Sequence, residues 1–203
     1  MAKALLAVMM QPPAHLEEEF NDWYDTEHLA DRAASPGFES SNRYDSVTGG
    51  PQAYLTLYDL SEIRTLETPE YKRVSGGNFT PWTKRLMRRI PRFRLLAEQI
   101  YPGDAAMVTA PFLTLVRMSD IQREAEPSIV SATSAYGRDH RVLQARAFRE
   151  TLDGRHNFLV VLASTNRIEQ DLDLRMLGDA AGSIDFVRTF IPHRAGWTWE
   201  KSI

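Results

Sequence analysis

The sequence predicts an α+β protein made of two similar halves, each with strands and helices in the order β-α-β-β-α-β. Three observations support this prediction. Short apolar runs alternate with longer segments of helical periodicity, and proline and glycine punctuate the chain between them. A pattern of turn glycine followed four residues later by an aromatic and an apolar strand occurs at Gly50–Tyr58 and again at Gly154–Leu162, about half the chain apart.

The first half opens with a short, continuous apolar run from Ala4 to Met10, which is typical of a buried strand. Pro12 and Pro13 end it. Apolar residues at helical spacing then predict a helix from about Ala14 to Ala34, which Ser35-Pro36-Gly37 stops. Two strands, a second helix and a closing strand are predicted to follow: Ser40–Val47, Ala53–Asp59, a helix capped by Ser61, interrupted at Gly76-Gly77 and restarted by Thr80-Pro81, and Arg92–Tyr101.

The second half repeats this order after Pro102-Gly103-Asp104. Its predicted elements are a strand at Phe112–Val116, a short helix around Ser119–Ser134 broken by Pro127, strands at Arg141–Phe148 and Phe158–Leu162 joined at Asp153-Gly154, a helix at Asn166–Leu177 and a strand at Phe186–Ile191. We therefore expect two ferredoxin-like βαββαβ units, residues 1–104 and 105–203, packed through their sheets. The space between the sheets is the expected pocket for an apolar ligand.

Composition excludes several classes of function. The net charge of −3 does not favour a nucleic-acid partner, because binding to the phosphate backbone needs a dominant basic surface. The chain has no cysteine, which removes disulfides, thiolate metal sites and a cysteine nucleophile. The apolar run at the N-terminus is too short to span a membrane. We therefore expect a cytoplasmic protein without a nucleic-acid or membrane partner.

The chemistry-bearing residues concentrate in the segment from Phe20 to Asp31, which holds two further aromatics, four carboxylates and a histidine. Tyr24 and His28 are four residues apart and share a helix face. Asp25 lies three residues before His28, and a carboxylate beside an imidazole makes a common general base. The alternative is a solvated acidic face with Trp23 in the core. Histidine and glutamate at helical spacing near His15 lack a third metal ligand, so no metal site is predicted.

The run Asp22–Leu29, followed by Pro36-Gly37-Phe38 and Arg43-Tyr44, resembles the signature of EthD-like proteins. Thr68–Tyr71 and Thr80–Arg85 are also similar to segments of that group. The resemblance covers about residues 3–100 and implies a tandem member of the dimeric α/β-barrel superfamily. It departs from the family at Ala30, where a proline is usual soon after the histidine.

The resemblance implies a cofactor-independent enzyme that acts on a small apolar or aromatic compound by general acid/base chemistry, of the lyase, dehydratase, isomerase or cyclase type. Two alternatives remain open, an oxygen-using monooxygenase or haem enzyme of the same fold, and a non-catalytic accessory protein. The predicted catalytic residues are His28, Tyr24 and Asp25, and the predicted substrate-binding residues are Trp23, Glu27, Arg43 and Trp82. For Arg43 the alternative is a surface arginine, and for Trp82 it is packing on the sheet. We expect one site per chain, no cofactor, and a monomer or homodimer.

Overall fold

The computed structural model describes residues 2–194 and has eight antiparallel strands in one closed barrel. The strands are β1 (Ala4–Met10), β2 (Asn42–Ser46), β3 (Tyr54–Leu60), β4 (Arg92–Tyr101), β5 (Phe112–Ile121), β6 (Val142–Leu152), β7 (Arg155–Ser164) and β8 (Ile184–Pro192). Their order around the barrel is β1-β3-β2-β8-β5-β7-β6-β4. Strands β1–β4 and β5–β8 therefore follow the same order, 4-1-3-2 and 8-5-7-6, which confirms the predicted α+β fold of two ferredoxin-like units.

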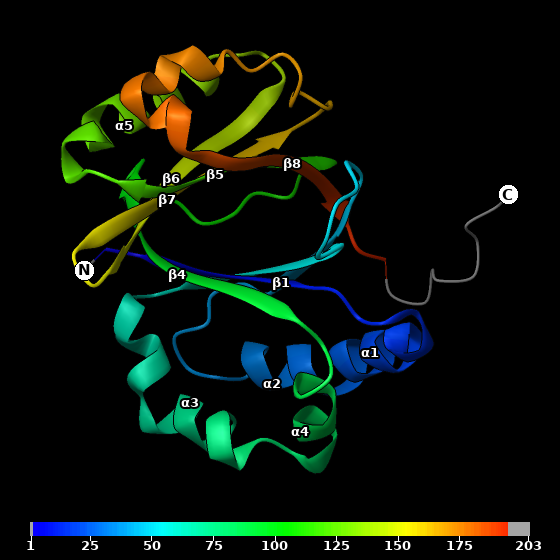
Figure 1. Cartoon of the computed structure of the whole chain (residues 1–203). Helices are drawn as coiled ribbons and strands as arrows, with labels where there is room; N and C mark the ends of the chain where they lie inside the picture. Colours follow the sequence, from blue (N-terminus) through cyan, green and yellow to red (C-terminus); the bar gives the residue numbers. More distant parts are fainter. Residues whose placement is uncertain (1, 195–203) are drawn as a thin grey trace, which may run out of the picture.

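Helices cover the barrel on two opposite sides (Figure 1). One layer contains α1 (Glu17–Trp23), α2 (Leu29–Ala33), α3 (Pro69–Arg73) and α4 (Pro81–Met87), and the other contains α5 (Glu126–Tyr136) with the 3-10 segment Leu174–Ser183. Shorter 3-10 turns lie at Ala14–Leu16, Ile63–Glu67, Gly76–Asn78 and Arg123–Ala125. Because each sheet has one face under helices, the other faces meet inside the barrel.

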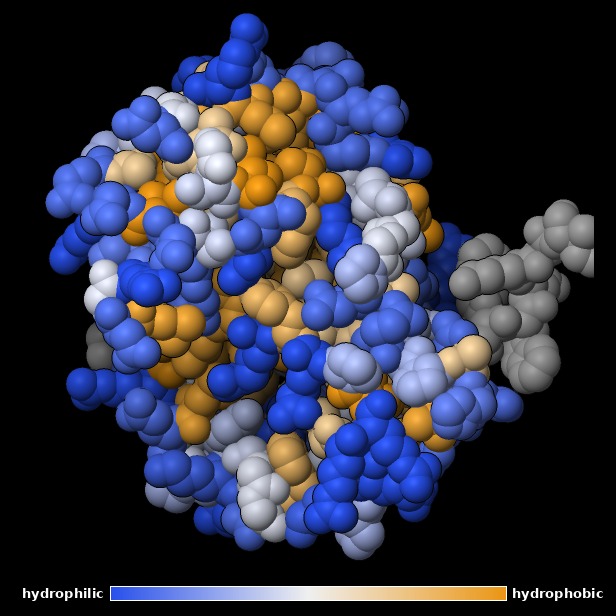
Figure 2. All heavy atoms as spheres, in the orientation of Figure 1, coloured by the Kyte–Doolittle hydropathy of each residue, from blue (hydrophilic) through white to orange (hydrophobic). Residues whose placement is uncertain are grey.

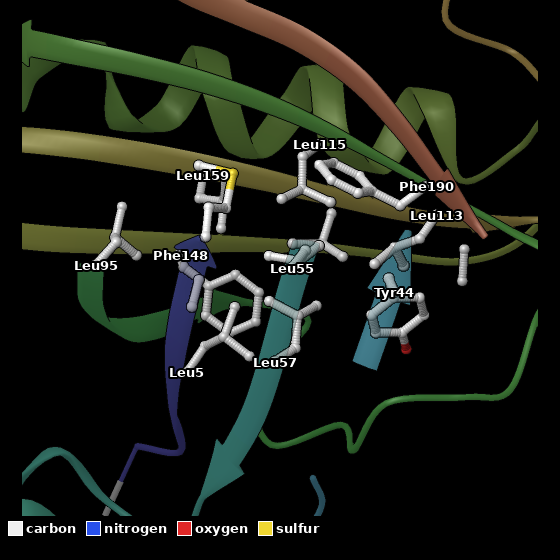
Figure 3. Packing of buried hydrophobic residues seen from close by; sticks show 14 of the residues in the cluster. Leu5, Tyr44, Leu55, Leu57, Leu95, Leu113, Leu115, Phe148, Leu159 and Phe190 are labelled. Atoms are coloured by element: carbon white, nitrogen blue, oxygen red, sulfur yellow. The ribbon is translucent and has the colours of Figure 1, made fainter. Parts of the chain in front are cut away.

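The barrel interior is packed with apolar side chains from all eight strands rather than open (Figure 3). Leu5, Leu55 and Leu57 contribute from one side, and Phe148 and Leu159 from the other. The expectation of a ligand pocket between the sheets is therefore wrong. At this strand number, inward side chains are large enough to fill the space.

One ion pair interrupts this apolar interior and joins the two halves. Arg146 of β6 donates to Asp59 of β3 over 2.6 Å, and both side chains are fully buried. Arg146 also donates to the side-chain oxygen of Gln99, while Asp59 accepts from Ser40 at 3.0 Å and from the backbone N–H of Met107 at 2.8 Å. Each charge thus has several hydrogen-bond partners, which a buried ion pair needs.

The two joints between the halves are short. Strand β4 pairs with β6 around Glu98–Tyr101, with an irregularity in the register, and β2 pairs with β8 through Tyr44–Ser46. The start of β2 has no β8 partner, because β8 ends at Pro192 opposite Tyr44. This leaves an opening beside the first residues of β2.

Local predictions met with different outcomes. The strand predicted at Arg92–Tyr101 is confirmed, as are the helical extent of the first segment and the Thr80-Pro81 helix start. The cap assigned to Ser61 is wrong, because its hydroxyl bonds Thr65 and the side-chain cap that forms is Thr68. The helix expected to be broken at Pro127 is continuous, since Pro127 falls in its first turn, where no N–H partner is needed. The helix predicted at Asn166–Leu177 is wrong apart from its end.

The face drawn in Figure 2 is largely hydrophilic, with apolar residues reaching the surface in patches between polar ones. No helix in residues 2–194 is long and apolar enough to cross a membrane. The predicted cytoplasmic location and the division into separate units at residue 104 stay predictions.

Candidate functional site

The predicted first helix contains a π-helical turn at Tyr24–His28 between α1 and α2. Such turns insert one residue into a helix and occur frequently at functional sites. Here the turn keeps Trp23, Tyr24 and His28 together against the sheet, with ring centroids of Trp23 and His28 4.3 Å apart and those of Tyr24 and His28 5.1 Å apart. The three side chains are buried between the helix layer and the outer face of the barrel.

His28 has a strongly apolar environment. Burial lowers the pKa of its imidazole well below the usual range, and the positive charges of Arg32 and Arg43 add to the effect. No side-chain hydrogen bond joins its ring to another residue in 2–194, and Asp25, its predicted partner, bonds Arg43 instead. His28 is therefore neutral at pH 7, and its predicted catalytic role stays a prediction.

Tyr24 lies deeper in the same layer. Its hydroxyl is 3.8 Å from the sulfur of Met10, and burial raises the pKa of its phenol, partly offset by contacts with Thr56 and Tyr58. Its ring faces the guanidinium of Arg43, whose Cζ is 4.5 Å from the ring centroid. Tyr24 thus supports Arg43 through a cation–π contact.

Trp23, Glu27 and Trp82, which are predicted to bind substrate, join the first helix to α4. The Trp23 indole N–H donates to the hydroxyl of Thr83 at 2.9 Å, and the same hydroxyl donates to Glu27 at 2.9 Å. The Trp82 indole N–H donates to Glu19 at 3.0 Å. In this geometry the three side chains hold two helices together, and their substrate contacts stay predictions.

Arg43 lies on the outer face of β2 and is no surface arginine. Its side chain is only 4% exposed, donates to the Asp25 carboxylate, and donates to the Asn21 side-chain oxygen at 2.7 Å. Asn21 in turn donates to the Tyr54 hydroxyl at 3.4 Å, which donates to Glu17 at 2.5 Å. A chain of polar contacts therefore runs from Arg43 along α1.

A cleft of about 440 Å³ opens where the start of β2 lacks a strand partner, and we call it the seam cleft. Asp25, Arg43 and His193 supply its charged or titratable groups. The remaining wall comprises Leu29, Ser40, Ser41, Asn42, Tyr44, Met107, Val108, Thr109, Ala110 and Pro192. Its volume falls within the range of about 300–1,000 Å³ that is usual for small-molecule sites.

His193 is the residue that sequence reasoning missed. Its Nδ1 lies 2.8 and 3.0 Å from the two carboxylate oxygens of Asp45, and its backbone N–H donates to the carbonyl of Arg43 at 2.9 Å. Its side chain is 7% exposed, so the expectation of an exposed histidine at a strand end is wrong. The two partners lie on strands that meet only in the closed barrel, and no local pattern indicates the pairing.

The arrangement at the seam cleft suits proton transfer beside an oxyanion. When Nδ1–H of His193 donates to Asp45, the Nε2 atom is left as a base. Arg43, on the same strand as Asp45, offers a fixed positive charge for a developing negative oxygen. Within residues 2–194, no three histidine or carboxylate side chains lie close enough together to hold a metal ion.

No family model matches the chain, and no curated protein matches it. Solved structures do. An anthrone oxidase-like protein shares 12% identity with a TM-score of 0.65, covering 100% of this chain and 97% of its own. A protein from Lactobacillus acidophilus NCFM, proposed to be a monooxygenase, shares 6% identity at 0.57, covering 95% and 94%. A heme-binding protein from Thermus thermophilus shares 10% identity at 0.57, covering 96% and 92%.

These similarities correct the expected activity. The named functions are those of oxidase-like, monooxygenase-like and heme-binding proteins, which contradicts the lyase, dehydratase, isomerase or cyclase expectation and favours the oxygen-using or haem alternative. At these identities the similarity establishes the fold and leaves the reaction open. The chain therefore has the dimeric α/β-barrel fold, here closed within a single polypeptide.

Proposed function

We propose that this protein is an oxygen-using oxidase or monooxygenase that acts on a small molecule bound in the seam cleft. The observation that carries the proposal is the meeting of a buried Arg43 with the His193–Asp45 pair at one cleft. The oxidase-like and monooxygenase-like structural neighbours support it.

In the proposed reaction, His193 takes a proton from an acidic C–H or O–H of the substrate, and Asp45 stabilises the resulting imidazolium. Arg43 stabilises the oxyanion of the enolate or phenolate that forms. Such an electron-rich anion can itself reduce oxygen. Conversion of a CH₂ group to a carbonyl consumes one O₂ and releases one water.

The five histidines were compared with what a haem needs, an axial ligand that faces an apolar slot. Both ring faces of His28 lie in packed aromatic surroundings, and His140 is 92% exposed. His15 is exposed, and His156 lies at the start of β7 beside Thr151. His193 faces a cleft whose wall includes Ser40, Ser41, Asn42 and Thr109. These surroundings do not fit a haem, and no step of the proposal uses one.

The proposal assigns the site to the first unit, residues 1–104, completed by His193 from the second. Proton transfer is assigned to His193 rather than His28 because His193 lines the cleft. The EthD-like character of residues 3–100 is part of the proposal and is supported by the segments Asp22–Leu29 and Arg43-Tyr44.

The test is oxygen uptake by the purified protein with anthrone and related enolisable aromatic compounds. We expect uptake by the wild type, a loss of about 100-fold or more in His193→Gln, and no change in His140→Gln, the exposed matched control. No uptake with any compound, or full activity in His193→Gln, contradicts the proposal. Uptake that requires added haem and comes with a Soret band returns the haem alternative.

A further inference from the structure

The Arg43 guanidinium is held by two kinds of partner. Asn21 and the ring of Tyr24 are neutral and lie on α1 and the π-helical turn, and both are buried. Asp25 is the charged partner, and its side chain is 25% exposed against 4% for Arg43. The carboxylate is therefore the outer member of the pair, on the side of the seam cleft.

Removal of the Asp25 carboxylate from this contact would leave a guanidinium that is still fixed in place. Asn21 would keep one of its nitrogens at 2.7 Å, and Tyr24 would keep the ring contact. The positive charge would then lack a partner, in a site where burial makes an unpaired charge costly. Such a site selects for a replacement anion.

We propose that Asp25 occupies, within the chain, the place at Arg43 that a planar oxyanion of the substrate takes on binding. This inference rests on the proposed function for the location of the substrate. The substrate class is an aromatic compound with a carboxylate, phenolate or enolate oxygen, because a guanidinium binds planar, delocalised oxyanions through two parallel N–H groups.

Two features of the cleft wall fit this class. The Ser41 hydroxyl is buried and has no hydrogen-bond partner in residues 2–194, so it is a donor available to a second oxygen. Leu29, Met107 and Pro192 provide apolar surface for a ring. Asp45, the other carboxylate nearby, is engaged by His193.

An internal competitor lowers the apparent affinity of the external ligand in proportion to the fraction of molecules in which the site is free. If about one molecule in ten has a free Arg43, deletion of the carboxylate tightens anion binding about tenfold. A neutral analogue of the same shape gains nothing, because it does not compete for the charge.

The experiment is calorimetric titration of wild type, Asp25→Asn and Asp22→Asn with benzoate and with benzamide. Asp22 is exposed on the same helix, so Asp22→Asn removes the same charge without touching Arg43. We expect benzoate to bind about tenfold more tightly to Asp25→Asn, with changes below about twofold for benzamide and for Asp22→Asn. The ionised form of 4-nitrophenol, compared with 4-nitroanisole, distinguishes a phenolate from a carboxylate preference.

Unchanged or weaker benzoate binding to Asp25→Asn overturns the inference, as does an equal gain for benzamide, which would indicate only a wider cleft. Circular dichroism checks the fold, and Asp25→Ser provides a second variant if the first does not fold. Because binding is measured without oxygen turnover, the inference and the proposed oxidation fail separately. Oxygen uptake by a protein that fails this titration leaves the oxidase proposal standing.

Discussion

The buried Asp59–Arg146 pair is expected to couple the two halves of the barrel strongly. Both side chains are fully buried, and Arg146 makes hydrogen bonds to Asp59 and Gln99. In Arg146→Met, the Asp59 carboxylate loses its cation and keeps only Ser40 and the Met107 N–H. A buried charge stranded in this way costs about 3–5 kcal/mol.

The same cost applies to Asp59→Leu, which strands the Arg146 guanidinium. The double variant removes both charges and leaves only neutral groups without partners, so we expect it to lose about 1–3 kcal/mol. The coupling energy between the two sites is then at least about 3 kcal/mol. For a chain of this size, each single substitution lowers the melting midpoint by about 6–20 °C.

Urea unfolding followed by tryptophan fluorescence and by circular dichroism measures the free energies of unfolding of all four proteins. Agreement of the two probes checks that unfolding has two states. A loss below about 1 kcal/mol in Arg146→Met refutes the reasoning. So does a double variant whose loss equals the sum of the two single losses, because the charges would then act independently.

Three further predictions concern stability. Because the folded-state pKa of His28 is lowered, the unfolded chain binds a proton first, so stability falls as the pH drops below about 6.5, by up to about 1.4 kcal/mol per pH unit; unfolding measured from about pH 7 to 5 should show a shallower slope in His28→Phe, and equal slopes contradict this. Thr83→Val deletes the acceptor of the Trp23 indole and a donor to Glu27 and should cost about 1–3 kcal/mol in urea unfolding, whereas exposed Lys84→Ala should change little. Gly37→Ala places a Cβ 2.7 Å from Thr65 at a φ of 88°, so its melting midpoint should fall further than that of Gly49→Ala, where φ is 72° and the space is open; equal losses would leave the clash without effect.

The fold was predictable because its signals are local. The apolar run Ala4–Met10, the breaks at Ser35-Pro36-Gly37 and the repeat of glycine and aromatic strand residues each act within a few positions. The predicted interior pocket failed because periodicity shows which side chains turn inward but not whether they fill the space. The α5 region failed through the position of Pro127, which starts a helix when it stands in the first turn.

The candidate site was predictable only in part, since it is assembled by barrel closure. Asp25 and Arg43 were selected from the sequence, and the structure brings them into contact. Their contact could not be derived, because a helix position and a strand position carry no signal of mutual approach. His193 and Asp45 meet across the β2–β8 joint, whose register depends on the whole barrel.

The short β2–β8 joint has a consequence for symmetry. In a barrel made from two identical chains, the two joints are copies, and a substitution in one appears in both. Here they carry different sequences: β4–β6 lies beside the Gln99 contact of the buried ion pair, while β2–β8 is cut short and holds the cleft. Covalent linkage of the halves thus allows one joint to evolve for cohesion and the other for chemistry, with a single site per polypeptide.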